Sequence, residues 1–431
     1  MIANQKPLRC ATAGSVDDGK STLIGRLLLD SKSLMTDQIA HVDEASKRRG
    51  LGRTDLALIT DGLRAEREQG ITIDVAWRYF ATPKRRFVLA DAPGHVQYTC
   101  NTVTACSTAE VAIVLVDVRK NMTEQTKRHL FVARLLGVKS LVLAVNKMDA
   151  VNFDHEAFVR VRDEVTSYLQ ALPKNLRPVD VSFVPVAALT GDNVVEPTRA
   201  MPWYDGPPLL QHLESLPNDE QTDSGARFPV QWVIRPQTPE NPDYRGYSGR
   251  LSSGSLEVGQ RVRVIPRGRE TTVTKLETAR GETERIDAGV SAVVHLADDI
   301  DVSRGDMIVS LEDGPRITRE IDATITWLHE TPARIGGTYW LRHTTREVKA
   351  TLERVDASFD VVTGTELPFT GTLGLNDLGR VRLKTSAPLC VDAYCDRRAT
   401  GALVLVDAST GETVAGAMVL PEAQAEQRAG A

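Results

Sequence analysis

The 431-residue sequence lacks a dominant charge, since 52 lysines and arginines stand against 57 aspartates and glutamates, for a formal net charge of −5. Domains that bind nucleic acid usually concentrate basic residues, so this composition argues against nucleic acid as a partner. No apolar run approaches the roughly 20 residues that a membrane-spanning helix needs. The stretch Met1–Lys6 also lacks the apolar centre of a signal peptide. We therefore expect a cytoplasmic protein that does not bind membranes.

Cysteine is scarce and follows no ligand pattern. The five cysteines form neither a C-x-x-C pair nor a metal-ligand series, and an odd count without a framework is typical of reduced thiols. Neither a disulfide framework nor a zinc site is therefore expected to hold the fold together. At this length, with 42% hydrophobic residues, the chain can form two or three domains with separate cores.

The most informative stretch is Gly14–Ser21, which fits the phosphate-binding pattern G-x-x-x-x-G-K-[ST]. The short apolar run Leu8–Ala13 before it predicts a buried strand, and Thr22–Leu29 after it predicts a packed helix. Glycines let the backbone approach phosphate, and the helix N-terminus supplies oriented N–H groups. We expect Lys20 to contact the β- and γ-phosphates and Ser21 to bind Mg²⁺. The residues expected to contact the nucleotide here are Gly14, Ser15, Val16, Asp17, Asp18, Gly19, Lys20, Ser21 and Thr22. The alternative, a Gly-rich strand-to-helix turn that arises by chance, does not explain the whole pattern.

A second motif follows the predicted strand Arg86–Asp91 and contains Asp91, Ala92, Pro93, Gly94 and His95. A carboxylate at the carboxyl end of a parallel strand lies where open α/β sheets bind ligands. Asp91 is therefore expected to hold Mg²⁺ through a water, opposite Ser21. Gly94 is expected to donate its N–H to a γ-phosphate. A histidine in a loop is as often a surface residue as a functional one, so the residues alone leave the role of His95 open.

A third motif identifies the base. The predicted strand Leu141–Val145 leads into Asn146, Lys147, Met148 and Asp149. A carboxylate only accepts hydrogen bonds, so Asp149 can receive the N1–H and N2–H₂ donors of guanine, a pair that adenine lacks. The quartet therefore selects GTP over ATP, with Asn146 tying adjacent loops together and Lys147 lying along the base. The exit loop of the last predicted strand supplies Ala187, Ala188 and Leu189, and the Ala188 N–H is expected to donate to guanine O6.

Three regions are expected along the chain. Strands alternate with helices from Leu8 to about Leu216, which predicts a mostly parallel sheet covered on both faces. Thr123 is expected to cap a helix that runs through Leu136. Beyond the polar linker Pro217–Gly225, short strands and Gly- and Pro-rich turns predict sandwiches or barrels. The expected boundaries are a nucleotide-binding domain at 1–222, β domains at 226–315 and 316–420, and a disordered tail at 421–431.

The ordered set Gly14–Ser21, Thr72, Asp91–Gly94 and Asn146–Asp149, followed by two β domains, resembles the translational-factor class of GTPases. Within that class the sequence resembles the GTPase subunits of bacterial heterodimeric sulfate adenylyltransferases from about Leu8 to Leu420. The runs that carry this resemblance are Gly14–Leu28, Asp61–Asp74, Gly191–Val195, Met201–Pro207 and Arg245–Arg250. Elongation factors typically carry histidine where this chain has Asp18.

The resemblance implies a P-loop GTPase domain followed by two antiparallel β-barrels, with GTP and Mg²⁺ as cofactors. It implies that GTP hydrolysis is coupled to the formation of adenosine 5′-phosphosulfate and pyrophosphate from ATP and sulfate. A smaller catalytic subunit would carry out that reaction, in a heterodimer or a higher heteromer. The implied catalytic residues are Lys20, Thr72 and His95, with His95 positioning the attacking water behind an apolar gate of Val16 and Ile71. The implied metal ligands are Ser21, Thr72 and Asp91.

The chain departs from the family pattern at positions that do not contact phosphate or metal. Ala92 replaces a threonine and Ala187 replaces a serine. The run Asn101–Ser107 differs at Thr102 and Ala105, so packing beneath the second switch, the nucleotide-responsive segment that follows Gly94, is expected to differ. No second phosphate loop occurs in the sequence, so the fused adenylylsulfate kinase found in some members is not expected.

Two other functions share part of this pattern. An elongation factor that delivers aminoacyl-tRNA would have the same motifs but basic surfaces on its β domains. Those domains contain Arg261, Arg263, Arg267 and Arg269, but acidic residues are interspersed among them. A P-loop kinase acting on a small molecule would need neither the guanine quartet nor the β domains.

Overall fold

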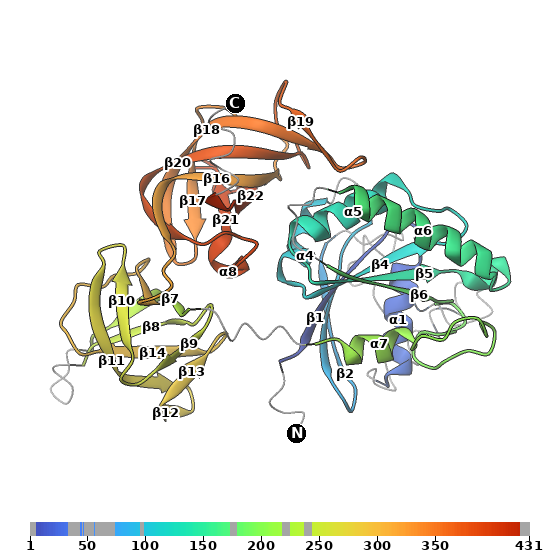
Figure 1. The fold of residues 1–431 in the computed structure, drawn as a ribbon, viewed down its shortest axis with the longest axis horizontal. Helices are drawn as coiled ribbons and strands as arrows, with labels where there is room; N and C mark the ends of the chain where they lie inside the picture. Colours follow the sequence, from blue (N-terminus) through green and yellow to red (C-terminus); the bar gives the residue numbers. More distant parts are fainter. Residues whose placement is uncertain are drawn as a thin grey trace. The chain divides into compact units, whose positions relative to one another are not determined.

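The computed structural model describes residues 6–32, 44, 46, 56, 74–94, 99–172, 179–217, 225–236 and 244–422. The chain divides into two compact units (Figure 1). The first unit comprises Met1–Asp219 and Asp360–Thr365, and the second comprises Glu220–Phe359 and Glu366–Ala431. Within the described ranges no helix is both long and apolar enough to span a membrane.

The first unit contains a six-stranded sheet in the order β2-β3-β1-β4-β5-β6. Its strands are β1 (Leu8–Ala13), β2 (Ala76–Ala81), β3 (Arg86–Asp91), β4 (Val111–Asp117), β5 (Ser140–Asn146) and β6 (Asp180–Pro185). Its helical segments are α1 (Lys20–Asp30), α4 (Thr99–Thr108), α5 (Glu124–Leu135), the 3₁₀ turn η4 (Met148–Val151), α6 (His155–Ala171) and α7 (Leu209–Ser215). Neighbouring strands are parallel, except that β2 runs antiparallel to β3. The mostly parallel sheet predicted from the sequence is therefore present.

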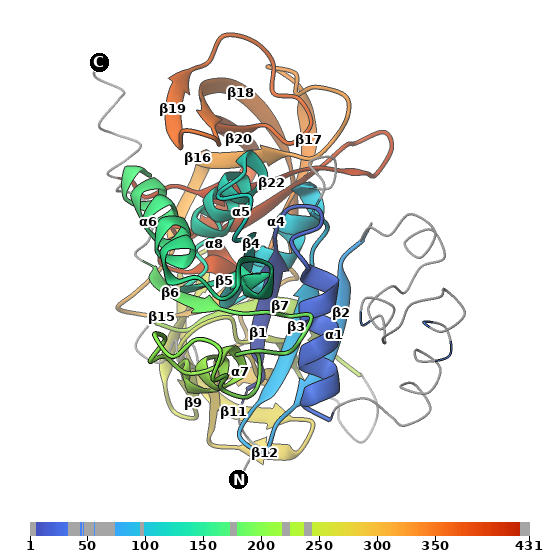
Figure 2. The ribbon, with the colours of Figure 1, turned by 90° about the vertical axis from the view of Figure 1, so that its right-hand side faces the viewer.

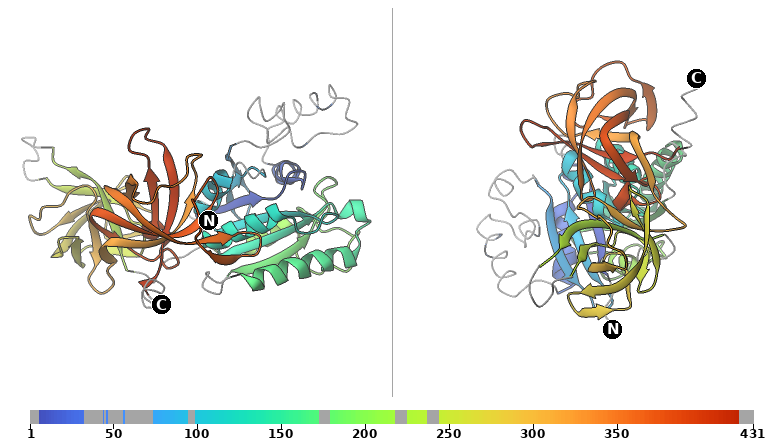
Figure 3. Two further views of the ribbon diagram at one scale, coloured as in Figure 1. Left: turned by 90° about the horizontal axis from the view of Figure 1, so that it is seen from above. Right: turned by 90° about the vertical axis from the view of Figure 1, so that its left-hand side faces the viewer.

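Helices cover both faces of this sheet. Leu23, Ile24 and Leu27 of α1 share a hydrophobic cluster with Leu209 and Leu213 of α7 and with strand residues. Helices α5 and α6 lie on the opposite face from α1 (Figures 2 and 3). Every residue of β4 and β5 is buried, as expected for central parallel strands.

Local predictions in this unit have mixed outcomes. The cap at Thr123 is confirmed, because its hydroxyl accepts the Thr126 N–H and α5 starts at the next residue. Strand β2 starts at Ala76, and residues 71–73, which include Thr72, lie outside the described part of the chain. The predicted disordered tail also lies outside it from residue 423 onward.

The second unit begins with a sheet in the order β10-β15-β7-β8-β14-β11-β12, which closes through an additional β10–β11 pairing. Its strands pair antiparallel and surround an apolar core that includes Phe228, Tyr247 and Ile308. The strands, with the small β9–β13 pair, are β7 (Arg227–Ile234), β8 (Gly246–Arg250), β9 (Ser255–Glu257), β10 (Arg261–Ile265), β11 (Arg269–Thr278), β12 (Gly281–Thr283), β13 (Arg285–Asp287), β14 (Ser291–Leu296) and β15 (Met307–Ser310).

A further sheet of the second unit has the order β17-β21-β22-β16-β20-β18-β19 and closes through β17–β18. Its core includes Trp327, Leu341 and Leu383. The elements are β16 (Arg316–Trp327), β17 (Thr338–His343), β18 (Arg346–Asp360), β19 (Thr365–Pro368), β20 (Leu378–Val391), α8 (Arg398–Gly401), β21 (Ala402–Val406) and β22 (Thr413–Val419). The residues alone left sandwich and barrel open, and both sheets are closed antiparallel barrels, as the resemblance implied.

Candidate nucleotide-binding site

The three sequence motifs meet at one edge of the first unit's sheet. Strands β1, β3, β4 and β5 are parallel neighbours, so their carboxyl ends lie at the same edge. That edge carries Gly14 after β1, Asp91 at the end of β3, Asp117 at the end of β4 and Asn146 at the end of β5. Open α/β sheets bind their ligands at this edge.

The phosphate loop requires glycine at its last turn. Gly19 has φ +92°, in the left-handed region, and precedes the first residue of α1. A Cβ at this position would lie 2.5 Å from Asn146 Nδ2, so the loop has no room for another side chain. The N-terminus of α1 has no side-chain cap and no acidic residue in its first turn. Its N–H groups are therefore positioned to bind an anion.

Lys20 lies inside the loop rather than in solvent. It is 8% exposed, and its Nζ donates to Gly14 O at 2.9 Å. Burial lowers the pKa of Lys20, while the nearby carboxylates of Asp91 and Asp18 act in the opposite direction. A Cβ at Gly94 would lie 2.5 Å from Lys20 Nζ and 2.7 Å from Gly14 O. The second motif therefore lies directly against the phosphate loop.

The residues present fit a magnesium ion that is bound together with phosphate. Ser21 is half-buried in the first turn of α1, and the buried Asp91 carboxylate accepts the Thr12 hydroxyl at 3.2 Å. Both supply the hard oxygen ligands that Mg²⁺ prefers, and Mg²⁺ usually keeps waters and phosphates as its other ligands. No group of three or more His, Cys, Asp or Glu side chains in the described residues could hold a metal alone. Thr72 and His95 lie outside the described residues.

Asn146 ties the guanine motif to its neighbours. Its Nδ2 donates to Asp18 O at 2.8 Å, and its Oδ1 accepts the Ala188 N–H at 3.0 Å. The Ala188 N–H, expected to serve guanine O6, is therefore already used by Asn146. Asp149 is half-buried in η4, and its carboxylate has no hydrogen-bond partner among the described residues. Asp149 thus remains an available acceptor for two donors.

Lys147 is held by an acidic residue that sequence reasoning missed. The Asp117 carboxylate is fully buried, lies 3.0 Å from Lys147 Nζ and accepts Arg119 Nε at 3.0 Å and Nη2 at 2.7 Å. Burial alone would raise the pKa of Asp117, but the hydrogen bonds from Arg119 and Lys147 outweigh it and hold the pKa below its usual range. Asp117 ends a central strand as Asp91 does, and that shared position is the feature that could have identified it.

Helix α5 supports the phosphate loop from behind. Ser15 Oγ lies 2.6 Å from Thr123 Oγ1, which lies 2.9 Å from Thr126 Oγ1. His129 is 1% exposed and hydrogen-bonds the backbone of Gly14. Burial lowers the pKa of His129 to about 3, so the imidazole is neutral at physiological pH. No local sequence pattern points to these contacts.

The remaining expected residues lie around the same edge. Ala92, Pro93, Met148 and Ala187 are buried, whereas Val16 and Thr22 are half-buried and Asp17 is exposed with φ +67°. Leu189 is 37% exposed, and its carbonyl accepts Arg26 Nη2 at 2.7 Å. Arg26, on α1, therefore fixes the guanine loop and is another residue that sequence reasoning missed.

Comparisons with known proteins identify two family domains in the chain. Residues 5–218 match the family described as the elongation factor Tu GTP binding domain, and residues 320–420 match the GTP-eEF1A C-terminal domain-like family. Two relatives called bifunctional enzyme CysN/CysC, from Mycobacterium tuberculosis strains CDC 1551 and H37Rv, are each 51% identical over 399 residues. That alignment covers 92% of this chain and 64% of each relative, so the chain spans less than two thirds of their length. A solved structure of sup35 complexed with GDP is 22% identical, with 97% of this chain and 95% of that chain covered and a TM-score of 0.44. Residues 5–218 are therefore a GTP-binding domain of the elongation factor Tu type, and residues 320–420 are a domain like the C-terminal domain of GTP-eEF1A.

Proposed function

We propose that this chain is the GTPase subunit of a sulfate adenylyltransferase. It would couple GTP hydrolysis to the formation of adenosine 5′-phosphosulfate and pyrophosphate from ATP and sulfate on a smaller catalytic subunit. The relatives support this proposal, because CysN denotes the large subunit of sulfate adenylyltransferase. The runs Gly14–Leu28 and Arg245–Arg250 and the acidic residue Asp18 point to the same family.

The nucleotide assignment rests on two residues at and just after the end of β5, Asn146 and Asp149. Asn146 joins the phosphate loop to the guanine loop, while the neighbouring Asp149 keeps an unused carboxylate. A free acceptor-only group beside a phosphate loop matches the two donors of guanine. GTP is therefore the nucleotide that this site fits best.

Each residue at the sheet edge has a proposed task. Lys20 and the N–H groups of α1 would hold the phosphates, and Ser21 and Asp91, with Thr72, would hold Mg²⁺. Mg²⁺ would supply positive charge to the phosphate oxygens. Gly94, which lies against Lys20, would lose or gain its contact with the γ-phosphate between nucleotide states. His95 would position the attacking water.

Coupling to another active site needs a conformational change that both reactions bias. We propose that the segments carrying Thr72 and Gly94 provide it, in a cytoplasmic heterodimer or higher heteromer with the catalytic subunit. We also propose domain boundaries at 1–222, 226–315 and 316–420.

The test uses the complex of this chain with a small adenylyltransferase subunit. Adenosine 5′-phosphosulfate formation should rise when GTP is added, and should lose that response in an Asp149→Asn complex. In that variant xanthosine triphosphate should restore the response, because the base then offers the acceptor that asparagine can bind. Failure to form a stable complex, or a rate that no nucleotide changes, would overturn the proposal.

Delivery of aminoacyl-tRNA is the alternative, because the matching family models come from translation factors. The barrel arginines argue against it. Arg261 and Arg263 both pair with Glu270, and Arg267 pairs with Asp301. These ion pairs weaken the attraction of Arg261, Arg263 and Arg267 for phosphates. Tight, GTP-dependent retention of aminoacyl-tRNA on filters at moderate salt would favour the alternative, and a preference for ATP over GTP would instead indicate a kinase.

A further inference from the structure

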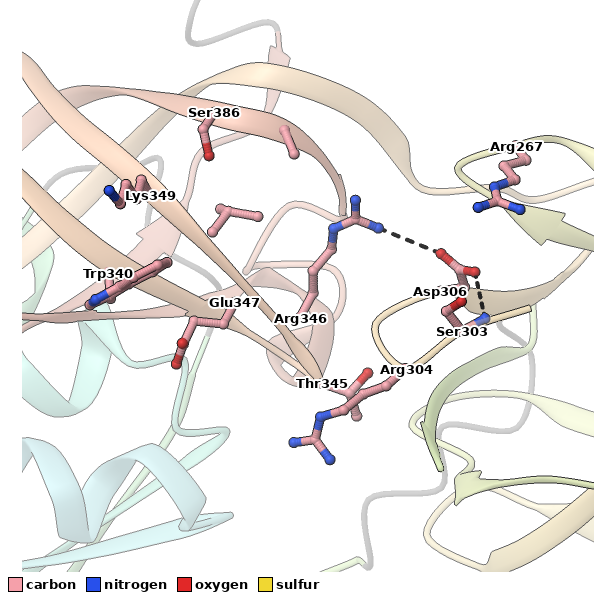
Figure 4. A pocket seen from close by; sticks show the side chains of 12 residues that line it. Arg267, Ser303, Arg304, Asp306, Trp340, Thr345, Arg346, Glu347, Lys349 and Ser386 are labelled. Atoms are coloured by element: carbon pink, nitrogen blue, oxygen red, sulfur yellow. Dashed lines mark hydrogen bonds and ion pairs between the residues drawn. The ribbon is translucent and has the colours of Figure 1, made fainter. Parts of the chain in front are cut away.

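The second unit contains a cavity of about 670 Å³ where loops of its two barrels meet (Figure 4). Ligand pockets in proteins commonly measure about 300–1,000 Å³. One wall comes from the β10–β11 turn and the loop before β15, with Arg267, Ser303, Arg304 and Asp306. The other comes from β17, β18 and β20 and includes Trp340, Arg346 and Lys349. None of these residues belongs to the nucleotide-binding site of the first unit.

The lining has more positive charge than its own carboxylates neutralise. Arg267 and Glu347 are each paired with a residue that does not line the cavity, Asp301 and Arg342 respectively. These two pairs leave Arg304, Arg346 and Lys349 as cations, with Asp306 as the one remaining carboxylate in the described lining.

Arg304, Arg346 and Lys349 have few ion-pair or hydrogen-bond partners among the described residues. Arg346 Nη1 lies 3.5 Å from Asp306 Oδ1, at the long end of a hydrogen bond. Arg304 Nη1 donates to Gln231 O at 3.2 Å, and Lys349 Nζ lies 5.6 Å from the Trp340 ring centroid. No described residue gives Arg304 or Lys349 a carboxylate partner. These planar and tetrahedral donors match the oxygens of a phosphate or sulfate group.

The same cavity provides hydroxyl groups and an apolar surface. Ser303 and Ser386 contribute hydroxyls, and Thr345 Oγ1 is buried without a hydrogen-bond partner in the described residues. Buried polar atoms normally have a partner, so Thr345 is a further group that a ligand could satisfy. Trp340, Val348 and Ala387 form the apolar part. Figure 4 shows Trp340 and Lys349 on one side and Arg346 pointing toward Asp306 on the other.

From this arrangement we propose that the cavity is a second ligand site, which binds a small molecule carrying a phosphate or sulfate group on a planar, apolar body. The unneutralised cations Arg304, Arg346 and Lys349 attract the oxyanion, and Trp340 stacks with the body. Because the ligand touches residues of both barrels, its binding also stabilises the second unit.

The test is calorimetric titration of the full chain, with GDP and Mg²⁺ present to fill the guanine site. The probes are potassium sulfate, potassium phosphate, pyrophosphate and adenosine 5′-monophosphate. We expect one additional site for adenosine 5′-monophosphate and a higher melting temperature for the second unit. The double variant Arg304→Gln/Lys349→Gln, at two exposed positions, should weaken binding at least about tenfold. Trp340→Ala should weaken binding of the nucleotide several-fold and leave binding of the inorganic anions unchanged.

Arg354→Gln is the matched control, because Arg354 lies on the same strand as Lys349 and neither it nor its ion-pair partner Asp356 lines the cavity. It should bind every probe as the unchanged chain does. The proposal is overturned if no probe binds at concentrations up to about 10 mM, if the double variant binds normally, or if Arg354→Gln weakens binding equally. If inorganic anions bind as tightly as the nucleotide and Trp340→Ala changes neither, the stacking role of Trp340 is wrong and the site takes a bare oxyanion.

Discussion

The side-chain amide of Asn146 donates to the backbone oxygen of Asp18 at 2.8 Å. Its carbonyl oxygen accepts the Ala188 N–H at 3.0 Å, so one side chain joins the phosphate loop to the loop after β6. Asn146 is 2% exposed, and Gly19 leaves room for its Nδ2 only because it has no Cβ. Asn146 therefore fixes the position of the phosphate loop relative to the loop expected to contact the base.

Replacing Asn146 by alanine should weaken the binding of both GTP and GDP. The change leaves the Asp18 carbonyl and the Ala188 N–H unpaired in a buried site, at about 1–3 kcal/mol each. We expect affinity to fall by at least about 30-fold, with similar losses for the two nucleotides, in titrations with a fluorescent GDP analogue and competition by GTP. Ser167→Ala, which removes an exposed hydroxyl on α6, is the control. Unchanged affinity in the Asn146 variant would show that the loops hold their positions without the tie.

Replacing Asp149 by asparagine should change the preferred base. The carboxylate accepts two donors, whereas an amide both donates and accepts, so guanine loses a contact that xanthine can make. We expect GTP affinity to fall at least about 100-fold and xanthosine nucleotides to become the better ligands. Competition binding measures both, and Asp163→Asn on the exposed face of α6 is the control. A variant that still prefers GTP would place guanine recognition elsewhere.

The sequence predicted the parts of this site that are encoded locally. A glycine with positive φ before a helix, and polar residues at the ends of apolar strands, leave recognisable patterns at Gly19, Asp91 and Asn146. The partner of the Ala188 N–H was not predictable in this way. It depends on how close the loop after β6 comes to the end of β5, which tertiary packing decides.

Contacts between distant segments could not be predicted. The ion pair of Asp117 with Lys147 and the contact of Ser15 with Thr123 join residues on different elements. Barrel closure has the same origin, because alternation of apolar residues predicts strands but not the β10–β11 and β17–β18 pairings. The cavity lined by Arg304 and Arg346 depends on two such closed sheets.

The buried carboxylate of Asp18 should make stability depend on pH. One oxygen accepts the Ser15 N–H at 2.8 Å, and Oδ1 has no partner among the described residues. Burial raises the pKa of Asp18 from 3.8 to about 6. The unfolded chain therefore releases this proton at lower pH than the folded chain does. The free energy of unfolding should fall as pH rises from about 4 to 6, with the full cost present above pH 6.

Asp18→Asn should remove this cost. At pH 8 the nucleotide-free protein should gain at most about 3 kcal/mol, and at pH 4 the gain should be close to zero. Urea unfolding at pH 4, 6 and 8 measures the difference, with Asp17→Asn at the exposed neighbouring position as control. A gain of the same size at all three pH values would mean that ionisation of Asp18 is not its cause.

Replacing Arg227 should destabilise the second unit. It is 0% exposed, and its Nε and Nη2 donate to Asp392 at 3.0 and 2.9 Å, while Nη1 donates to Asp313 O at 2.6 Å. Arg227→Met would leave the buried Asp392 carboxylate without its main partner, at a cost of about 3–5 kcal/mol in the free energy of unfolding. Urea unfolding should show this loss, whereas Arg250→Met, at an exposed position of β8, should change little.

The double variant Arg227→Met/Asp392→Leu tests whether the loss of stability comes from the unpaired charge of Asp392 or from lost hydrogen bonds. If the cost comes from an unpaired buried charge, removing Asp392 as well should recover most of the stability, because an apolar pair of similar volume can replace a buried ion pair. Thr400, whose hydroxyl donates to Asp392 Oδ2 at 2.6 Å, would then lose its acceptor and limit the recovery. If the double variant is instead less stable than Arg227→Met alone, the hydrogen bonds of Asp392 stabilise the second unit independently of Arg227.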